Sequence, residues 1–446
     1  MLQIMNFFKR KNTSFTSQDT ADSAAMPSAA GFSESGFAEK ATPAPRRPRS
    51  ARQTPSTVNH DAFKDMLKID CPNPTAEESA RDGFQQTGQR LVRQENWPAL
   101  SEAIRKYDLA GTLTTGSMPV ADLIAFGARA DVVLAAEHAI RESDHRVAKE
   151  VLTGIEAFEH VLEEYPDDYI VACIVAQAHI DIGWAWRGNG WDKDVPKRNR
   201  DAFEAHLARA DDIIEPFLAR HANSPLLSAT HCAQVNGPAN RKEQVADKYE
   251  HLINLNPLNP GPMRAMGNHL LPRWFGSYAQ LELEARRTAA RTEHIWGAGG
   301  YTWVQFDAIS CDDEACANLD LPFFIEGLRD ILSRNSDAYT ANLLAAYCAN
   351  TIGQGFTGND KADSVRAQIA GCTEWIVREH LTELHPMVWA HAAHGFDNNL
   401  RISSPRKFAA AGRDDAMRIM AGLFKSEIAA GKRIVFTENG PQANAV

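Results

Sequence analysis

The residues best suited to chemistry in this chain are the tryptophans and arginines of two short segments. Residues 183–191 hold three tryptophans, one arginine and three glycines, and residues 271–277 read Leu-Pro-Arg-Trp-Phe-Gly-Ser. Indole rings form flat apolar walls, and guanidinium groups bind anions through paired hydrogen bonds. If both segments line one concave pocket, that pocket suits an anionic or sugar-like ligand. The candidate binding residues are Trp184, Trp186, Arg187, Gly188, Gly190, Trp191, Arg273, Trp274 and Gly276.

The same two segments also have a purely structural interpretation. Arg187 or Arg273 can stack on an indole ring, and the glycines let two backbones approach closely. The first segment would then fill a gap between neighbouring helices. Loops held by a rigid scaffold often carry function, so both interpretations stay open.

Four histidines fall within residues 380–394, and two of them, His391 and His394, share one face of a helix. Two imidazoles on one face can bind a metal ion if a third histidine or an acid converges on them. The segment has no His-Glu-x-x-His pattern, and the glycine after His394 is typical of a helix end. We therefore expect no metal site in this segment. His391 and His394 are the candidate ligands if the segment does bind a metal ion.

The remaining motifs lack the partners that catalysis needs. The acids of residues 311–314 do not have the spacing of a calcium loop, and they favour the start of a helix. The glycines of residues 353–359 and 297–300 follow no predicted strand, so they indicate turns between helices rather than phosphate loops. No nucleophile, base and orienting group are recognisable together. We expect no catalytic residue and no cofactor, and an enzyme is the less favoured alternative.

The elements that must position these segments are helices. From about residue 75 onward, apolar residues recur every three or four positions, as along one face of a helix. Residues 169–184 are apolar nearly all round, which predicts a helix enclosed by its neighbours. Alternating strand patterns are almost absent, and residues 433–437 are the best short exception. The sequence predicts an all-α fold. One clear helical face consists of Phe203, Leu207, Ala210, Ile214 and Phe217.

Prolines follow the predicted helical segments at regular intervals. Pro166, Pro225 and Pro257 each follow a helical segment, and a period of about 34 residues with one inserted loop fits both intervals. A helix that ends at proline and is soon followed by another helix is typical of stacked antiparallel pairs. Residues 145–270 thus resemble tetratricopeptide repeats, which predicts a curved α-solenoid.

The two Trp/Arg segments resemble those of a bacterial family of unknown function. Its members pair a Trp-Arg-Gly-x-Gly-Trp segment with a Pro-Arg-Trp-x-Gly-Ser segment inside a helical repeat, and the resemblance covers about residues 85–350. It implies a fold and no particular chemistry. The positions that match the family are Trp184, Trp186, Arg187, Gly188, Gly190, Arg273, Trp274 and Gly276.

Charge and cysteine content narrow the classes of partner and compartment. The net charge is −10, with +4 on the first sixty residues and −14 on the rest. An acidic body repels phosphates, so we expect no nucleic-acid partner and no binding to anionic membranes. Seven cysteines without a Cys-x-x-Cys pair indicate reduced thiols. With no secretory pattern and no apolar run of about 18 residues, we expect a cytoplasmic protein without stable membrane insertion.

Four regions follow from these patterns. We expect a disordered Ser/Ala/Pro-rich tail over 1–60, a helical-repeat domain over 75–350, C-terminal helices packed on the same array over 351–432, and a short tail over 433–446. Solenoids present extended concave surfaces, so the first hypothesis is a protein-binding scaffold or adaptor with a protein or peptide partner. The alternative is a small-ligand sensor or an enzyme with a Trp/Arg-lined pocket. Oligomeric state and pathway stay open.

Overall fold

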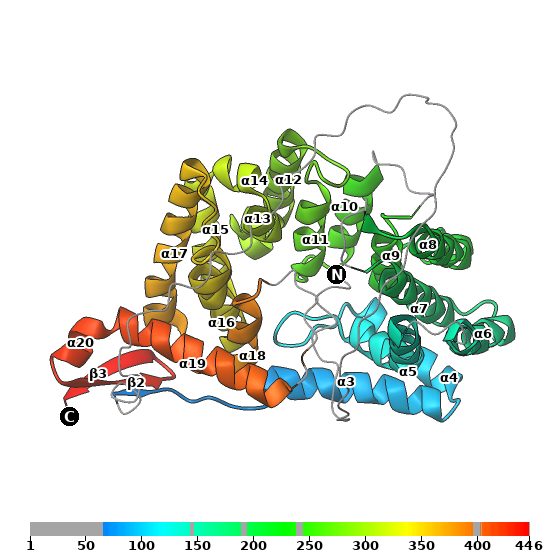
Figure 1. Cartoon of the computed structure of the whole chain (residues 1–446), viewed down its shortest axis with the longest axis horizontal. Helices are drawn as coiled ribbons and strands as arrows, with labels where there is room; N and C mark the ends of the chain where they lie inside the picture. Colours follow the sequence, from blue (N-terminus) through cyan, green and yellow to red (C-terminus); the bar gives the residue numbers. More distant parts are fainter. Residues whose placement is uncertain are drawn as a thin grey trace, which may run out of the picture.

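The computed structural model describes residues 66–142, 147–188, 194–237, 244–395, 402 and 404–445, and the predicted tail of residues 1–60 lies outside them. Within the described part the protein is mostly helical, as predicted, with eighteen α-helices and one small sheet (Figure 1). The helices are α3 (Ala76–Arg93), α4 (Trp97–Leu109), α5 (Val120–Glu142), α6 (Val147–Glu164), α7 (Tyr169–Arg187), α8 (Lys197–Leu218), α9 (Pro225–Ala233), α10 (Val245–Leu255), α11 (Gly261–His269), α12 (Tyr278–Trp296), α13 (Gly299–Cys311), α14 (Asp313–Ala317), α15 (Leu321–Arg334), α16 (Ala338–Ala346), α17 (Asp360–His380), α18 (Pro386–Ala392), α19 (Pro405–Leu423) and α20 (Lys425–Ala429), with a π-helix, η4 (Tyr347–Ile352), after α16.

The helices α4 to α9 enclose one buried apolar core, with α7 at its centre. All residues of α7 from Tyr169 to Ile180 are buried, as the sequence predicts for an enclosed helix. The helix begins after Asp168, whose carboxylate accepts a hydrogen bond from the Ile170 amide. Among the described helices, α7 is long and apolar enough to cross a membrane by length and composition, and 78% of that stretch is buried inside the protein.

A second core joins α9 to α20 with a three-stranded sheet. The strand β1 (Leu67–Lys68) pairs in parallel with β2 (Lys432–Thr437), and β2 pairs antiparallel with β3 (Gly440–Ala445). The predicted strand at residues 433–437 is confirmed. The prediction of a short tail over 433–446 is wrong, because Ile434 and Phe436, alternate residues of β2, are both buried in the core and anchor a hairpin there.

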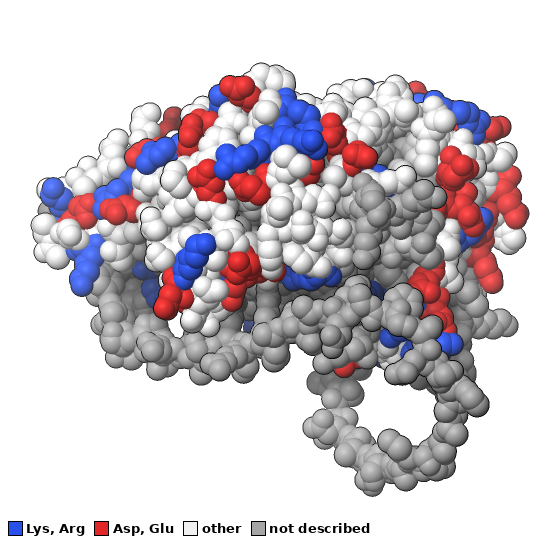
Figure 2. All heavy atoms as spheres, turned by 90° about the horizontal axis from the view of Figure 1, so that it is seen from above, with Lys and Arg blue, Asp and Glu red and all other residues white. Residues whose placement is uncertain are grey.

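From α3 to α17 the chain progresses from one end of the molecule to the other, whereas β1 pairs with β2 at the second end (Figure 1). The helices α3 to α8 lie at one end, α10 to α13 lie between, and α17, α20 and the sheet lie at the other end. The helix α9 contributes Leu226 to the first core and Ala229 to the second, so it marks the boundary between them. Viewed from above, acidic side chains gather towards the end that holds α6 and α8 (Figure 2).

Candidate functional site

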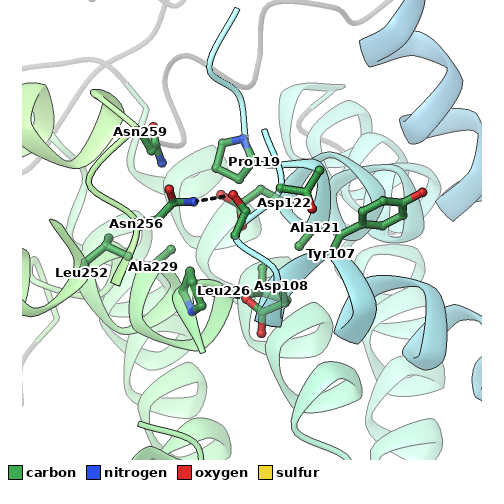
Figure 3. A pocket seen from close by; sticks show the side chains of 13 residues that line it. Tyr107, Asp108, Pro119, Ala121, Asp122, Leu226, Ala229, Leu252, Asn256 and Asn259 are labelled. Atoms are coloured by element: carbon green, nitrogen blue, oxygen red, sulfur yellow. Dashed lines mark hydrogen bonds between the residues drawn. The ribbon is translucent and has the colours of Figure 1, made fainter. Parts of the chain in front are cut away.

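A small pocket that is partly open to solvent lies at the boundary between the two cores, and its accessible volume is about 10 Å³. The end of α4, the loop before α5 and the first turn of α5 form one side (Figure 3). The start of α9, the end of α10 and the loop before α11 form the other side. The polar side chains of its wall include those of Asp108, Asp122, Asn256 and Asn259.

Asp108 holds the start of α9 in place. Its carboxylate accepts hydrogen bonds from Ser224 Oγ at 2.5 Å, the Leu226 amide at 2.7 Å and the Tyr169 hydroxyl at 3.1 Å. Ser224 in turn caps α9 by accepting from the Leu227 amide. Burial raises the pKa of Asp108, and the three hydrogen bonds oppose that rise. With three donors on one carboxylate, Asp108 serves as a structural anchor.

Asp122 lines the same pocket but has no such partners. The residue is only 5% exposed, and no residue in the described part of the chain donates a hydrogen bond to its side chain or forms an ion pair with it. Burial and the negative charge of Asp108 raise the pKa of Asp122 to about 7, while the positive charge of Arg129 opposes this rise. A buried carboxylate without a donor is costly, so it is uncommon in structural cores.

Two asparagines face these acids across the pocket (Figure 3). Asn256 Nδ2 donates to the Gly111 carbonyl at 3.3 Å, which ties the two sides together. Asn259 Oδ1 accepts from the Gly261 amide and thereby orients the start of α11. The Asn256 Oδ1 atom makes no hydrogen bond with the described residues, so it is a second acceptor within the pocket wall.

A buried polar network behind the pocket fixes the helix that carries Asp122. Arg129 lies two turns further along α5, is 1% exposed, and donates to Asp181 at 2.7 Å and to Gln177 at 2.8 Å on α7. Gln177 then donates to Thr230 on α9 at 2.9 Å. These bonds link α5, α7 and α9, so the helices on both sides of the pocket are held in one arrangement.

The loop that carries Pro119 is held by α3. Glu77 is buried, and its carboxylate accepts from the Thr114 hydroxyl at 2.6 Å and from the Gly116 amide at 2.8 Å. Arg81, one turn further along α3, pairs with Glu77 at 2.5 Å. The loop before α5 is therefore a fixed wall of the pocket.

The pocket can bind a hydrogen-bond donor that carries positive charge. Its open polar atoms include the Asp122 carboxylate and Asn256 Oδ1, which accept hydrogen bonds, and the nearby Asp108 adds negative charge. Within the described residues, no group of three or more His, Cys, Asp or Glu side chains is arranged to hold a metal ion. The apolar part of the wall comes from Leu226, Ala229 and Leu252.

The first Trp/Arg segment lies at the end of α7, away from this pocket. The Arg187 guanidinium lies 5.6 Å from the Trp184 ring centre, and that ring packs edge-on against Phe203 of α8. Trp186 lies beneath the Arg198 guanidinium of α8 at 5.2 Å. The contact of Arg187 with the Trp184 ring is of the kind that the structural interpretation describes, whereas that of Arg198 with Trp186 was not predicted.

The glycines of this segment are described only in part. Gly188 ends α7 with a φ of 66°, in the left-handed region that favours glycine. Gly190 and Trp191 lie outside the described residues.

The second Trp/Arg segment lies between α11 and α12. Arg273 donates to Asn268 at 2.7 Å and lies 2.9 Å from the Cys311 sulfur. Trp274 packs against His269, and its indole nitrogen has no hydrogen-bond partner among the described residues.

Gly276 has a steric role in the same segment. A Cβ at this position would lie 2.4 Å from the Leu270 carbonyl oxygen, so only glycine fits there. Two backbones approach closely at this point, as the structural interpretation of the glycines predicts.

The structure does not bring the described parts of the two segments together. Trp184 and Trp186 pack against the first core, whereas Phe275 packs against the second. None of the predicted binding residues that the structure describes lines the pocket of Asp122. Asp108 and Asp122 were not predicted from the sequence as site residues. The available signal was a single acid, Asp122, within the apolar run of residues 120–126.

The two candidate metal ligands lie at the end of α18. His391 is buried against Phe408, with ring centres 4.7 Å apart, and burial lowers its pKa to about 3. His394 stacks on the same ring, and Gly395 follows with a φ of 84°. This left-handed glycine is the helix end that the sequence predicts.

In comparisons with known proteins, no protein family, no curated protein and no solved structure matches this chain.

Proposed function

We propose that this protein is a helical-repeat binding protein whose pocket at Asp122 holds the primary ammonium group of its ligand. The observation that carries the proposal is the carboxylate of Asp122, a buried residue of the pocket wall, which has no partner among the described residues. A ligand cation would supply the missing donor and offset the cost of burying the charge. Stacked helix pairs, as in tetratricopeptide repeats, would provide the rigid frame.

An ammonium group fits the chemistry of the wall. It offers three N–H donors around one compact charge, and the pocket presents acceptors on both sides. The negative charge of the chain outside its first sixty residues also favours a cationic ligand. A short aliphatic chain behind the ammonium group would contact the apolar residues Leu226, Ala229 and Leu252.

The test is calorimetric titration of the full-length protein with n-butylamine. We expect binding to the wild type and at least tenfold weaker binding to Asp122→Asn, because a charge-assisted hydrogen bond contributes about 1.5–3 kcal/mol. The control is Asp201→Asn, which removes an exposed carboxylate on α8 and should bind as the wild type does. 1-Butanol, which has no positive charge, should not bind. Equal affinity of the wild type and Asp122→Asn for butylamine would contradict the proposal.

A further inference from the structure

The free space inside the Asp122 pocket is about that of one water molecule. Its accessible volume is about 10 Å³, and a cavity needs roughly 10–15 Å³ of such volume to hold a single water molecule. An ammonium group, one nitrogen surrounded by its hydrogens, is of similar size. The pocket therefore has space for the nitrogen of a ligand, whereas a carbon atom attached to that nitrogen must lie on the open side.

The walls of the pocket are fixed by hydrogen bonds on both sides. Asp108 binds the start of α9 through the bonds described above. The bond from Asn256 Nδ2 to the Gly111 carbonyl joins the end of α10 to the loop after α4. The bonds of Arg129 and its partners link α5, α7 and α9. Because packed interiors resist expansion, a larger group cannot enter without displacing these helices.

The open acceptors of the wall equal the donors of a primary ammonium group in number. Two Asp122 oxygens and Asn256 Oδ1 accept no hydrogen bond from a described residue, unlike the oxygens of Asp108. A primary ammonium group brings three N–H donors and one carbon. A secondary ammonium group brings two donors and two carbons, so one acceptor stays unpaired and the second carbon must lie within the walls.

Two leucines contribute bulky apolar side chains to the wall, Leu226 on α9 and Leu252 on α10. Leu226 belongs to the anchor of α9, because its amide donates to Asp108. Leu252 is 1% exposed and has no part in that anchor. Its side chain is therefore the one whose length limits the pocket independently of the bonds that hold α9.

We infer that this pocket recognises the nitrogen alone, that it accepts the ammonium ion and unsubstituted primary amines, and that it excludes N-methylated amines. This inference rests on the ammonium site proposed above. It adds the class of ligand and assigns Leu252 as a residue that sets the size limit at the nitrogen.

Calorimetric titration of the full-length protein with a methylation series tests the inference. The probes are the chloride salts of ammonium, methylammonium, dimethylammonium and tetramethylammonium, compared at one ionic strength. We expect ammonium and methylammonium to bind with dissociation constants within threefold of each other. Dimethylammonium should bind at least tenfold more weakly than methylammonium, and tetramethylammonium should not bind.

Shortening Leu252 should relax the limit. In Leu252→Ala, dimethylammonium should bind within threefold of methylammonium, because the loss of three carbons from the wall makes room for the second methyl group. Leu252→Val is a milder variant in which the difference should narrow, and it serves if the alanine variant does not fold. The matched control is Leu332→Ala, since Leu332 of α15 is fully buried and does not line the pocket. This control should keep the wild-type difference.

The outcomes separate the two proposals. If dimethylammonium binds the wild type as tightly as methylammonium does, the size limit is wrong and the ammonium site stands. If n-butylamine binds and ammonium does not, recognition of the nitrogen alone is wrong. If the folded Leu252 variants keep the wild-type difference, the assignment of Leu252 is wrong. If neither n-butylamine nor any probe of the series binds, the ammonium site itself is wrong.

Discussion

Asp108 and Asp122 show how two buried carboxylates in one pocket take different roles. Asp108 accepts three hydrogen bonds and anchors α9, while Asp122 has no partner among the described residues. A carboxylate that is satisfied by fixed donors contributes to the fold, whereas an open one is costly until a ligand arrives. Such a cost is typical of binding sites, where function is maintained at the expense of stability.

This cost predicts a pH-dependent gain in stability for Asp122→Asn. The folded-state pKa of about 7 lies above the ordinary value near 3.9, so the folded protein holds a proton that the unfolded chain releases. The stability contributed by protonated Asp122 is therefore complete below about pH 4 and is lost as pH rises through about 7. We expect the gain in Asp122→Asn to be about 2–3 kcal/mol larger at pH 8 than at pH 5.

Urea unfolding of both proteins at the two pH values measures this difference. Asp131→Asn is the matched control on the same helix, because Arg93 lowers the pKa of Asp131. That variant should show no gain at high pH. A constant difference between wild type and Asp122→Asn from pH 5 to pH 8 would show that Asp122 does not titrate as described.

At the scale of elements, α3 and α5 pack through glycines on both helices. A Cβ on Gly88 of α3 would lie 2.0 Å from the Ile124 carbonyl oxygen, and a Cβ on Gly127 of α5 would lie 1.9 Å from the Gln85 carbonyl oxygen. Each glycine thus admits the backbone of the other helix. This close contact fixes α5, and with it Asp122, against α3.

Gly88→Ala should therefore destabilise the protein, although alanine favours helices. We expect a loss of about 1–3 kcal/mol, because the added methyl group forces the two helices apart. Gly83→Ala on the same helix meets no atom within 4 Å and should gain about 0.5–1 kcal/mol. Thermal unfolding of both variants tests this prediction. Equal changes in stability for the two variants would show that helix propensity alone determines the effect of the alanine.

The sequence predicts the individual helices better than it predicts which helices pack against one another. The face of Phe203, Leu207 and Ile214 is buried on α8. The turn between α12 and α13 is shorter than the predicted 297–300, because only Gly297 and Ala298 separate the two helices and Gly299 begins α13. These features depend on local spacing and local backbone preference. The pocket could not be predicted in this way, because Asp122 and Asn256 meet only through the packing of distant helices.

Across the whole molecule, the first described strand closes on the C-terminal hairpin. The Ile434 amide donates to the Met66 carbonyl, and the Leu384 amide donates to the Asp70 carbonyl. Ile434 is 1% exposed and packs in the second core. The segment before α3 is thus bound along the far end of the helical array.

Ile434→Ala should loosen both ends at once. We expect a loss of about 2–4 kcal/mol from the cavity, and faster hydrogen exchange at the Leu384 amide as the first segment detaches. Val435→Ala, on the less buried face of the same strand, is the control and should change that exchange little. Unchanged protection of Leu384 in Ile434→Ala would show that the two ends open independently.

The pairing of β1 with β2 also bears on how the protein is made. The ribosome adds about 5–20 residues per second, so Leu67 emerges tens of seconds before its partner Ile434. During that interval the helices around α7 can form from local contacts, but β1 has no strand to join. The strand β2, which is translated late, therefore completes the fold when it pairs with β1, which is translated early. A message truncated before residue 434 yields a chain that cannot form this strand pairing.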